Sequence, residues 1–310
     1  MNSWLIFRGG AVGDFIVTLP ALRSIRSVFP DSRITLVTYP RVFRLALESG
    51  LADDVESLDG SETGLLYSSG LPASGRLAAL VGNHEHVVSF LRDPDGAVKR
   101  NLLEAGAGRL LCVDPLVENE HAVDHFLQPL KSEGISAGEG VAPRLCLSEQ
   151  RIEEGKHILN SFGSRVCLFH PGSGSSRKNW SLRNFTATAA RLEKKVGVRC
   201  VFTFGEADSL CKEEFIREGA GFPCMENVEL ATLASMLVSC AAYAGNDSGI
   251  THLAGAAGAP AVALFGPTEP EIWGPRNGNV HIIRSPAEAN GDIDGISADE
   301  VAEMLIRIVR

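Results

Sequence analysis

Short runs of apolar and β-branched residues alternate with longer segments of helical periodicity along most of the chain. The predicted strands are 4–7, 33–38, 86–91 and 109–114 in the first half, and 165–170, 198–204, 241–245, 261–266 and 280–284 in the second. Strands that alternate with helical segments are typical of parallel sheets covered by helices. The pattern therefore predicts an α/β fold.

Between the two groups of strands lies "GISAGEGVAPRLCLS", residues 134–148, which is rich in Gly, Ala and Pro. Such composition is typical of a linker. We therefore expect two Rossmann-like domains, 1–148 and 149–310, whose parallel sheets face each other across a cleft. Ligands of open parallel sheets bind beyond the carboxyl ends of the strands, so the informative residues are expected just after strands.

Composition narrows the class of protein. A net charge of −9 over 310 residues argues against a nucleic-acid-binding protein, because phosphate contacts require a clustered basic surface. No apolar run approaches the roughly 18 residues of a membrane span, and the first residues do not resemble a signal peptide, so we expect a cytoplasmic protein. The seven cysteines are scattered singly without a C-x-x-C pair, which favours reduced thiols in the core.

The first loop of interest is "RGGAVGD", residues 8–14, between a predicted strand and a helix. Arg8 replaces the first glycine of the dinucleotide fingerprint, and Asp14 stands where a P-loop has Lys, so neither motif fits. Gly9, Gly10 and Gly13 allow a tight turn and the close approach of another molecule. A carboxylate at a helix N-terminus is held ionised by the helix dipole. Asp14 is therefore either a catalytic base or an acid that only stabilises the helix end.

A second loop, "GNDSGITHLAGAAGAP", spans residues 245–260 and predicts a strand end followed by a helix that ends at Gly258. We expect the backbone N–H groups around Ser248 to Thr251 to form an anion site at the helix N-terminus, which suits a diphosphate. The alternative is an ordinary capped helix.

The third loop, "HPGSGSSRKNW", spans residues 170–180. Like the second, it follows a predicted strand and contains Gly and Ser, and it also carries basic residues. Gly172 and Ser173 offer amide and hydroxyl donors, and Arg177 and Lys178 supply the cations that a diphosphate needs when no metal is bound. The alternative is a flexible surface loop with solvated basic residues. Trp180 argues against that alternative, because a tryptophan in such a loop is usually held by packing.

Other polar residues are given structural roles. His252 is interpreted as a structural histidine near the anion site rather than as a general base. His121 and His125 have the i, i+4 spacing of zinc ligands, but with no third ligand evident a solvated pair is favoured. The two Asp-x-Asp motifs, at 93–95 and 292–294, are interpreted as turns. The sequence therefore predicts a site that needs no metal.

Taken together, the loops resemble the heptosyltransferase family, glycosyltransferase family 9. The resemblance rests on three stretches that follow the family's order along nearly the whole chain. They are "RGGAVGDFIVTLPALRSIRSVFPDSRITLVT", "HPGSGSSRKNWSLRNF" and "GNDSGITHLAGAAGAPAVALFGPTEPEIWGP".

The resemblance implies a GT-B fold in which the first domain binds the acceptor and the second the nucleotide sugar, with the final helix packed back on the first domain. It implies an inverting, metal-independent transferase without a cofactor that moves heptose from ADP-heptose to the inner core of lipopolysaccharide. Asp14 becomes the base, and Lys178, Asp247, Ser248 and Gly249 hold the donor.

The acceptor of that family is strongly anionic, whereas the first half of this chain has few basic residues. The basic residues considered for the acceptor or for the inner membrane surface are Arg41, Arg44, Arg92, Lys99 and Arg100. Residues 61–77 are interpreted as a loop or irregular insert.

Two other classes of protein compete with this interpretation. One is a different enzyme, either a GT-B nucleotide-sugar epimerase or a dinucleotide oxidoreductase, and Arg8 counts against the oxidoreductase. The other is a relative that binds nucleotide sugars without catalysis, and the joint presence of Asp14, Lys178 and Asp247 counts against it.

Overall fold

The computed structural model describes residues 2–68, 75–135, 141–218 and 221–310. The chain divides into two compact units, 1–141 and 142–310. The division comes earlier than the expected boundary at 148. The cause is that the second unit binds the segment after 141: Leu145 donates its N–H to Ala256 O at 2.8 Å, and Asn277 donates to Pro143 O at 2.7 Å.

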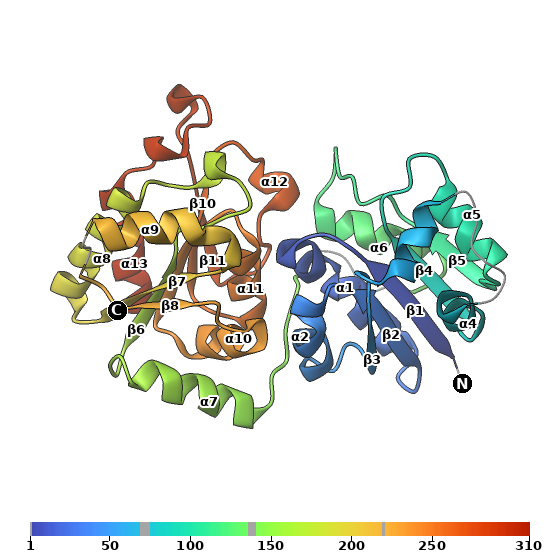
Figure 1. The fold of residues 1–310 in the computed structure, drawn as a ribbon. Helices are drawn as coiled ribbons and strands as arrows, with labels where there is room; N and C mark the ends of the chain where they lie inside the picture. Colours follow the sequence, from blue (N-terminus) through green and yellow to red (C-terminus); the bar gives the residue numbers. More distant parts are fainter. Residues whose placement is uncertain (1, 69–74, 136–140, 219–220) are drawn as a thin grey trace. The chain divides into compact units, whose positions relative to one another are not determined.

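The first unit is built on a parallel sheet in the strand order β3-β2-β1-β4-β5 (Figure 1). Its strands are β1 (Ser3–Arg8), β2 (Arg33–Thr38), β3 (Asp54–Ser57), β4 (His86–Phe90) and β5 (Arg109–Cys112). Its helices are α1 (Val12–Val28), α2 (Phe43–Glu48), α3 (Ser61–Gly64), α4 (Arg76–Gly82), α5 (Ala97–Glu104) and α6 (Ala122–Ser132).

Alternate residues of the central strands build the core of this unit, as the period of a β-strand requires. Leu5 and Phe7 of β1 and Val87 of β4 share one apolar cluster with Leu77 of α4 and Val98 of α5. Helices α1 and α6 pack against each other. The predicted α/β organisation of the first half is therefore confirmed.

The second unit has a parallel sheet in the order β11-β10-β9-β6-β7-β8. Its strands are β6 (Val166–His170), β7 (Arg199–Phe204), β8 (Cys224–Glu226), β9 (Ala242–Asn246), β10 (Ala261–Phe265) and β11 (Val280–Arg284). Its helices are α7 (Glu149–Asn160), α8 (Leu182–Val196), α9 (Ser209–Arg217), α10 (Leu230–Ser239), α11 (Gly249–Ala257), α12 (Pro270–Trp273) and α13 (Ala298–Val309).

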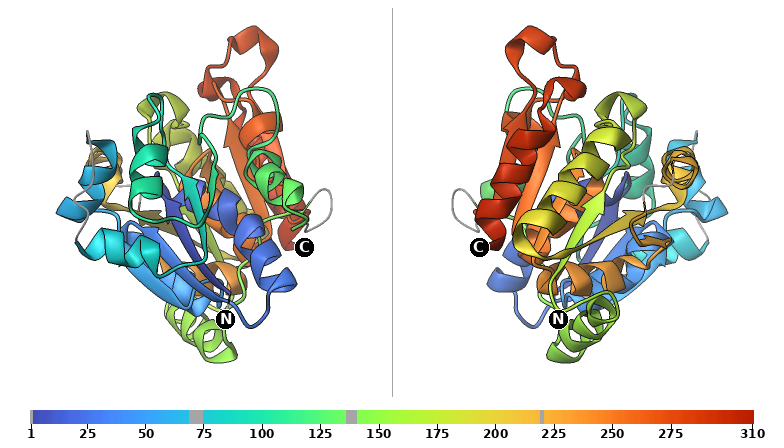
Figure 2. Two further views of the ribbon diagram at one scale, coloured as in Figure 1. Left: turned by 90° about the vertical axis from the view of Figure 1, so that its right-hand side faces the viewer. Right: turned by 90° about the vertical axis from the view of Figure 1, so that its left-hand side faces the viewer.

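The final helix, α13, begins after Ser297, whose side chain accepts a hydrogen bond from the Asp299 N–H. In the right-hand view of Figure 2 the red α13 lies beside the yellow-green α8. Its residues Val301, Leu305 and Val309 belong to the core cluster of the second unit. The apolar face of α13 therefore packs within the core of the second unit.

Two further details depart from the sequence interpretation. Strands β3 and β8, both short strands at sheet edges, were not predicted. The insert at 61–77 is partly helical: it contains α3, a 3-10 turn at Leu65–Tyr67 and the start of α4, whereas 69–74 lie outside the described residues. Asn101 Nδ2 donates to the carbonyl of Leu66 at 2.8 Å, which anchors the 3-10 turn.

The helices were also compared with the requirements of a membrane span. In the ranges that the structure covers, none is both long and apolar enough to cross a bilayer.

Candidate active site

Residues 9–11, which connect β1 to α1, follow the strand at which the first sheet reverses its direction of winding. Strands β2 and β3 extend the sheet on one side of β1, and β4 and β5 extend it on the other. Ligands of open α/β sheets bind at such switch points. The loop singled out from the sequence thus occupies the expected ligand position of the first unit.

Asp14 lies in the first turn of α1, and its carboxylate folds back over this loop. Oδ2 accepts a hydrogen bond from the Ala11 N–H at 2.7 Å, so Asp14 does stabilise the helix end. Gly10 has a φ of +91°, and a Cβ there would lie 2.6 Å from Oδ2, so only glycine lets the carboxylate approach this closely. The Asp14 side chain is nevertheless 32% exposed. A helix-end role and a reactive role are therefore compatible in one carboxylate.

The other two glycines of the loop differ from Gly10. A Cβ on Gly9 would lie 3.3 Å from Leu58 Cδ2, a tight contact, and Gly13 lies inside α1. Close packing therefore restricts position 9, whereas conformation restricts position 10.

Arg8, the last residue of β1, lies beneath Asp14 with 2% of its surface exposed. Its Nε donates to Asp14 O at 2.9 Å, and its Nη2 lies 3.4 Å from Asp14 Oδ1. Its guanidinium carbon is 4.4 Å from the centre of the Phe126 ring. Burial lowers the pKa of Arg8 to about 10, which the charge of Asp14 partly opposes.

The arginines expected at the acceptor side are distributed unequally. Arg41 Nη2 donates to Gly10 O at 2.8 Å, so this side chain reaches the Asp14 loop. Arg44 pairs with Glu48 at 2.7 Å on the surface of α2. Arg92 is exposed just after β4, the neighbour of β1. Of the three, Arg41 is the one that the structure brings to the loop.

In the second unit, the two expected loops follow β6 and β9, and a further loop at 266–275 follows β10; the three strands are adjacent. Lys178, from the loop after β6, donates to Asp247 Oδ2 at 2.7 Å. Thr268, from the loop after β10, donates to the same oxygen at 2.7 Å. One residue from each loop thus meets in a single cluster at the edge of the sheet where ligands are expected.

Asn246, a fully buried residue at the end of β9, ties two of these loops together. Its Nδ2 donates to Pro171 O at 2.7 Å, and its Oδ1 accepts from the Trp180 N–H at 3.1 Å. Trp180 is itself 1% exposed and donates from Nε1 to Ile296 O at 3.0 Å. The prediction that Trp180 orders this loop is confirmed.

Helix α11 begins beside the Lys178–Asp247–Thr268 cluster. Ser248 caps it by accepting from the Thr251 N–H at 3.3 Å, and Gly258 ends it with a φ of +88°, as predicted. Gly249, the first residue of the helix, is part-exposed, whereas His252 is 7% exposed. Free N–H groups at a helix start attract anions, so the cluster has an ammonium group and a helix N-terminus at the same place.

The loop at 170–180, called the Pro-Gly loop below, packs against a buried aspartate, Asp208, whose role the sequence did not reveal. A Cβ on Gly172 would lie 1.9 Å from Asp208 Oδ1, so glycine is required there. Asp208 Oδ2 accepts from the Gly205 N–H at 2.7 Å and lies 3.5 Å from His170 Nε2. Burial lowers the pKa of His170, although Asp208 opposes this shift. The loop backbone at Gly172 thus packs closely against the Asp208 carboxylate.

Two other members of that loop have simpler surroundings. Ser173 donates from Oγ to Asn179 Oδ1 at 2.6 Å, so its hydroxyl stabilises the loop. Arg177 is exposed. Lys178 is therefore the basic residue of the loop that enters the cluster.

The predicted solvated pair His121 and His125 is wrong. His121 caps α6 by accepting from the Val123 N–H at 3.1 Å, and His125 contacts Glu120 Oε1 at 3.1 Å and Asp114 O at 2.6 Å. Both rings are engaged in local hydrogen bonds at the start of the helix.

Both Asp-x-Asp motifs lie in turns, as predicted. Asp93 accepts from the Val98 and Lys99 N–H groups at the start of α5. Asp292 accepts from the Asp294 N–H, and Asp294 accepts from the Ser181 N–H ahead of α8. These carboxylates are used as helix and turn caps.

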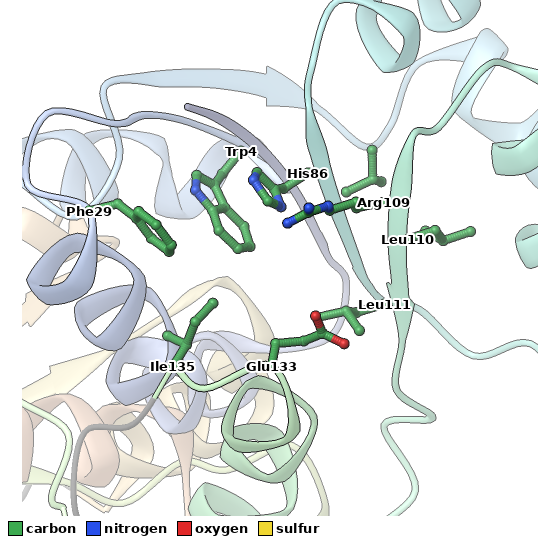
Figure 3. Close-up of a pocket in the computed structure, with 9 residues that line it drawn as sticks. Trp4, Phe29, His86, Arg109, Leu110, Leu111, Glu133 and Ile135 are labelled. Carbon is green, nitrogen blue, oxygen red and sulfur yellow. The ribbon is translucent and has the colours of Figure 1, made fainter. Parts of the chain in front are cut away.

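A pocket of about 490 Å³ opens at the opposite edge of the first sheet (Figure 3). Trp4, His86 and Arg109, at the amino ends of β1, β4 and β5, line it together with Phe29 and Glu133. The rings of Trp4 and His86 stack at 4.1 Å. None of the predicted site residues lines this pocket, because they follow the carboxyl ends of the strands.

Sequence reasoning missed four residues that shape the two loop clusters: Arg8, Asn246, Thr268 and Asp208. Arg8 and Asn246 carried a usable signal, since each is a polar residue that ends an apolar strand. Thr268 and Asp208 have no such signal, because their contacts depend on which loops become neighbours.

With this geometry in place, comparison with known proteins identifies the family. The model of glycosyltransferase family 9 (heptosyltransferase) matches residues 117–295, which is more than half of the chain. The chain belongs to glycosyltransferase family 9. The matched residues include the loops after β6, β9 and β10, and the expected transferase class is confirmed.

Solved structures agree with this family 9 assignment at the level of the fold. A family 9 glycosyl transferase from Veillonella parvula superposes with a TM-score of 0.82 at 20% identity, over 99% of this chain and 97% of that one. The ADP-heptose lipopolysaccharide heptosyltransferase II of E. coli gives 0.76 at 19% identity, over 100% and 98% of the two chains. The predicted GT-B type fold with two Rossmann-like units is therefore confirmed.

A curated family member matches over a shorter stretch. Lipooligosaccharide heptosyltransferase 2 of Haemophilus influenzae is 41% identical over 49 residues, 16% of this chain and 14% of that protein. The matched segment thus spans about a seventh of the relative's length.

Proposed function

We propose that this family 9 protein is an inverting glycosyltransferase that moves heptose from ADP-heptose to the inner core of a lipopolysaccharide acceptor. The observation that carries the proposal is the cluster of Lys178, Asp247 and Thr268 beside the N-terminus of α11. An ammonium group next to unpaired helix N–H groups suits a nucleoside diphosphate. A solved E. coli heptosyltransferase with the same fold contains ADP, which supports adenine as the nucleobase of the donor.

In the proposed reaction, the acceptor hydroxyl oxygen forms a bond to the anomeric carbon of the donor sugar. The bond between that carbon and the β-phosphate oxygen breaks, and ADP leaves with the electron pair. Asp14 takes the hydroxyl proton and later releases it to water. Attack on the side opposite the leaving group inverts the configuration.

Lys178 and the α11 N–H groups stabilise the charge that grows on the diphosphate. The Pro-Gly loop adds Gly172, Ser173 and Arg177 at the donor, and His252 supports the helix behind the phosphates. Because these groups supply positive charge themselves, we propose that the reaction needs neither a metal ion nor a cofactor.

On the acceptor side, we propose that Arg41 meets anionic groups of the acceptor, assisted by Arg44 and Arg92. A lipid-linked acceptor places the enzyme at the inner face of the cytoplasmic membrane. Basic residues contribute about 1 kcal/mol each near an anionic surface, so Arg41, Arg44, Lys99 and Arg100 support weak, salt-sensitive association. Sedimentation with anionic liposomes should therefore fall as salt is raised, and absence of binding at low salt contradicts membrane association.

The proposed donor is tested by calorimetric titration with ADP, UDP and GDP in the presence of a chelator. ADP should bind most tightly and should raise the melting temperature most, because a ligand of the native state stabilises it in step with its affinity. Transfer from ADP-heptose is then followed as ADP release with and without acceptor. Preference for UDP or GDP, or a requirement for added metal, contradicts the proposal.

A further inference from the structure

Arg8 is the buried charged group at the Asp14 loop to which the proposed reaction gives no task. It ends a strand whose preceding residues, Trp4 to Phe7, are all in the apolar core, and it is itself 2% exposed. Strand pairing places it directly beside Phe90, the last residue of β4. A buried cation is costly unless it is paired and hydrogen-bonded, so its presence calls for a reason.

We propose that Arg8 is a positioning residue that fixes the carboxylate of Asp14 for proton transfer. The inference deepens the proposed function, since it rests on Asp14 acting as the base. Arg8 does not face the acceptor. It acts through Asp14, which lies between the guanidinium and solvent.

The contacts of the guanidinium fix Asp14 at two places. Nε donates to the Asp14 main-chain carbonyl at 2.9 Å, which holds the first turn of α1, and Nη2 lies 3.4 Å from Oδ1. The Ala11 N–H holds the other oxygen, Oδ2, at 2.7 Å. With both oxygens held from within the protein, rotation of the carboxylate is restricted and its remaining lone pairs face outward.

The guanidinium is in turn fixed to the sheet and to α6. Nη1 lies 3.5 Å from Phe90 O, and the Phe126 ring covers the guanidinium plane at 4.4 Å. These contacts come from β4 and α6, elements distant in the sequence from the loop. Arg8 therefore links the base to the rigid frame of the first unit.

Lysine cannot replace this arrangement, because its ammonium group is a point charge without the planar fork of donors. Arg8→Lys keeps the charge but loses the simultaneous contacts to Asp14 and Phe90. A small misplacement of a catalytic group can cost about 100-fold in rate, so we expect Arg8→Lys to lower kcat roughly 10- to 100-fold. The KM for ADP-heptose and the affinity for ADP should stay unchanged, because the donor residues lie in the second unit.

The decisive experiment is a double-mutant cycle with Asp14→Asn, measured as ADP release from ADP-heptose with acceptor present. If Arg8 acts through Asp14, Arg8→Lys should change the residual rate of Asp14→Asn by less than about twofold, because coupled residues are not additive. Equal fold losses in both backgrounds overturn the positioning role and leave the proposed function intact. Normal kcat in Asp14→Asn itself overturns both.

A packing control separates positioning from damage to the fold. Phe126→Leu removes the ring beneath the guanidinium but none of the hydrogen bonds to Asp14, so its kcat should fall less than that of Arg8→Lys. A second variant, Arg8→Met, removes the charge and should lose at least as much kcat as Arg8→Lys. A larger loss in Phe126→Leu than in Arg8→Lys overturns the inference.

Discussion

Each unit presents an ion pair at the carboxyl ends of its central strands, and the two pairs differ in which charge is buried. In the first unit the cation is buried and the anion faces out: Arg8 is 2% and Asp14 32% exposed. In the second unit the anion is buried and the cation faces out: Asp247 is 6% and Lys178 30% exposed. Burial of one partner determines which charge a ligand meets, so similar loops can present a proton acceptor in one unit and an anion-binding group in the other.

The pairs also differ in how the chain builds them. Six residues separate Arg8 from Asp14, and both belong to one strand-loop-helix connection. Lys178 and Asp247 are 69 residues apart and meet because β6 and β9 are neighbours in the sheet. The first pair forms between residues close in the sequence, and the second forms only because two strands are neighbours in the sheet. Variants should therefore affect the two pairs separately.

The largest effect is expected for Asp14→Asn, which removes the outward charge of the first pair. Transfer should fall by roughly two to four orders of magnitude, the range for loss of a general base. Stability should fall modestly, because asparagine can still accept from the Ala11 N–H but no longer supplies the charge opposite the buried Arg8. ADP release with acceptor, ADP affinity and melting temperature should be measured on the same preparation.

Near-normal turnover contradicts the assignment of Asp14 and shows that the carboxylate only stabilises α1. A large loss of melting temperature shows instead that the variant has damaged the helix. Asp14→Glu, which keeps an acid at the third position of α1, should then restore the melting temperature and shows whether turnover follows the fold or the position of the carboxylate.

The next largest effect, on ADP binding, is expected from Lys178, the more exposed partner of the second pair. Lys178→Ala should weaken ADP binding by about 1.5 to 3 kcal/mol, the range for a hydrogen bond to a charged group. It also leaves the buried Asp247 carboxylate near the phosphates without its cation. Lys194→Ala, on the exposed surface of α8, is the matched control and should bind ADP normally. Unchanged ADP affinity in Lys178→Ala removes this residue from the site.

A smaller effect should come from Thr268→Val, which preserves shape but removes the second hydrogen bond to Asp247 Oδ2. We expect ADP binding to weaken by about 0.5 to 1.5 kcal/mol, as for an ordinary hydrogen bond. The comparison variant is Thr186→Val, whose hydroxyl donates to Arg183 O in α8. If the two variants bind ADP equally well, Thr268 does not contribute to the cluster.

The smallest effect is a pH dependence of stability that comes from His170. Burial lowers its pKa below the usual 6.5, so in acid the unfolded chain binds a proton that the folded chain does not. Stability should therefore fall as the pH drops below 6.5, by at most about 1.4 kcal/mol per pH unit. Urea unfolding at pH 7.5 and 5.5 should show a weaker dependence in His170→Asn. Equal dependences in both proteins contradict this assignment.

Much of the fold could be predicted from the sequence, because apolar strands alternate so regularly with helices. Strand β2 at 33–38 and β11 at 280–284 have the predicted limits. Strands β3 and β8 were missed because they are only four and three residues long and contain acidic residues. The amphipathic pattern of α13 reveals an apolar face but not the surface that the face covers, which is the core of the second unit.

For the candidate site, too, the sequence could predict some residues and not others. Asp14 and the glycines around it could be found because their contacts are local. Lys178 could be named as an anion-binding residue, and Asp247 only through the family resemblance, but no spacing in the sequence shows that they form a pair. Thr268 required the strand order β10-β9-β6, which periodicity does not provide.

The two hydrogen bonds of Asn246 have a consequence for the entropy of nucleotide binding. They hold Pro171 and Trp180, at opposite ends of the Pro-Gly loop, to the residue that precedes Asp247. Immobilising a flexible side chain on binding costs about 0.5 to 1.5 kcal/mol. Lys178 already has its geometry fixed by Asp247 in the free protein, and the loop that carries it is closed at both ends. In the proposed function, a diphosphate therefore meets a preorganised loop, and little of its binding free energy is lost to ordering the chain.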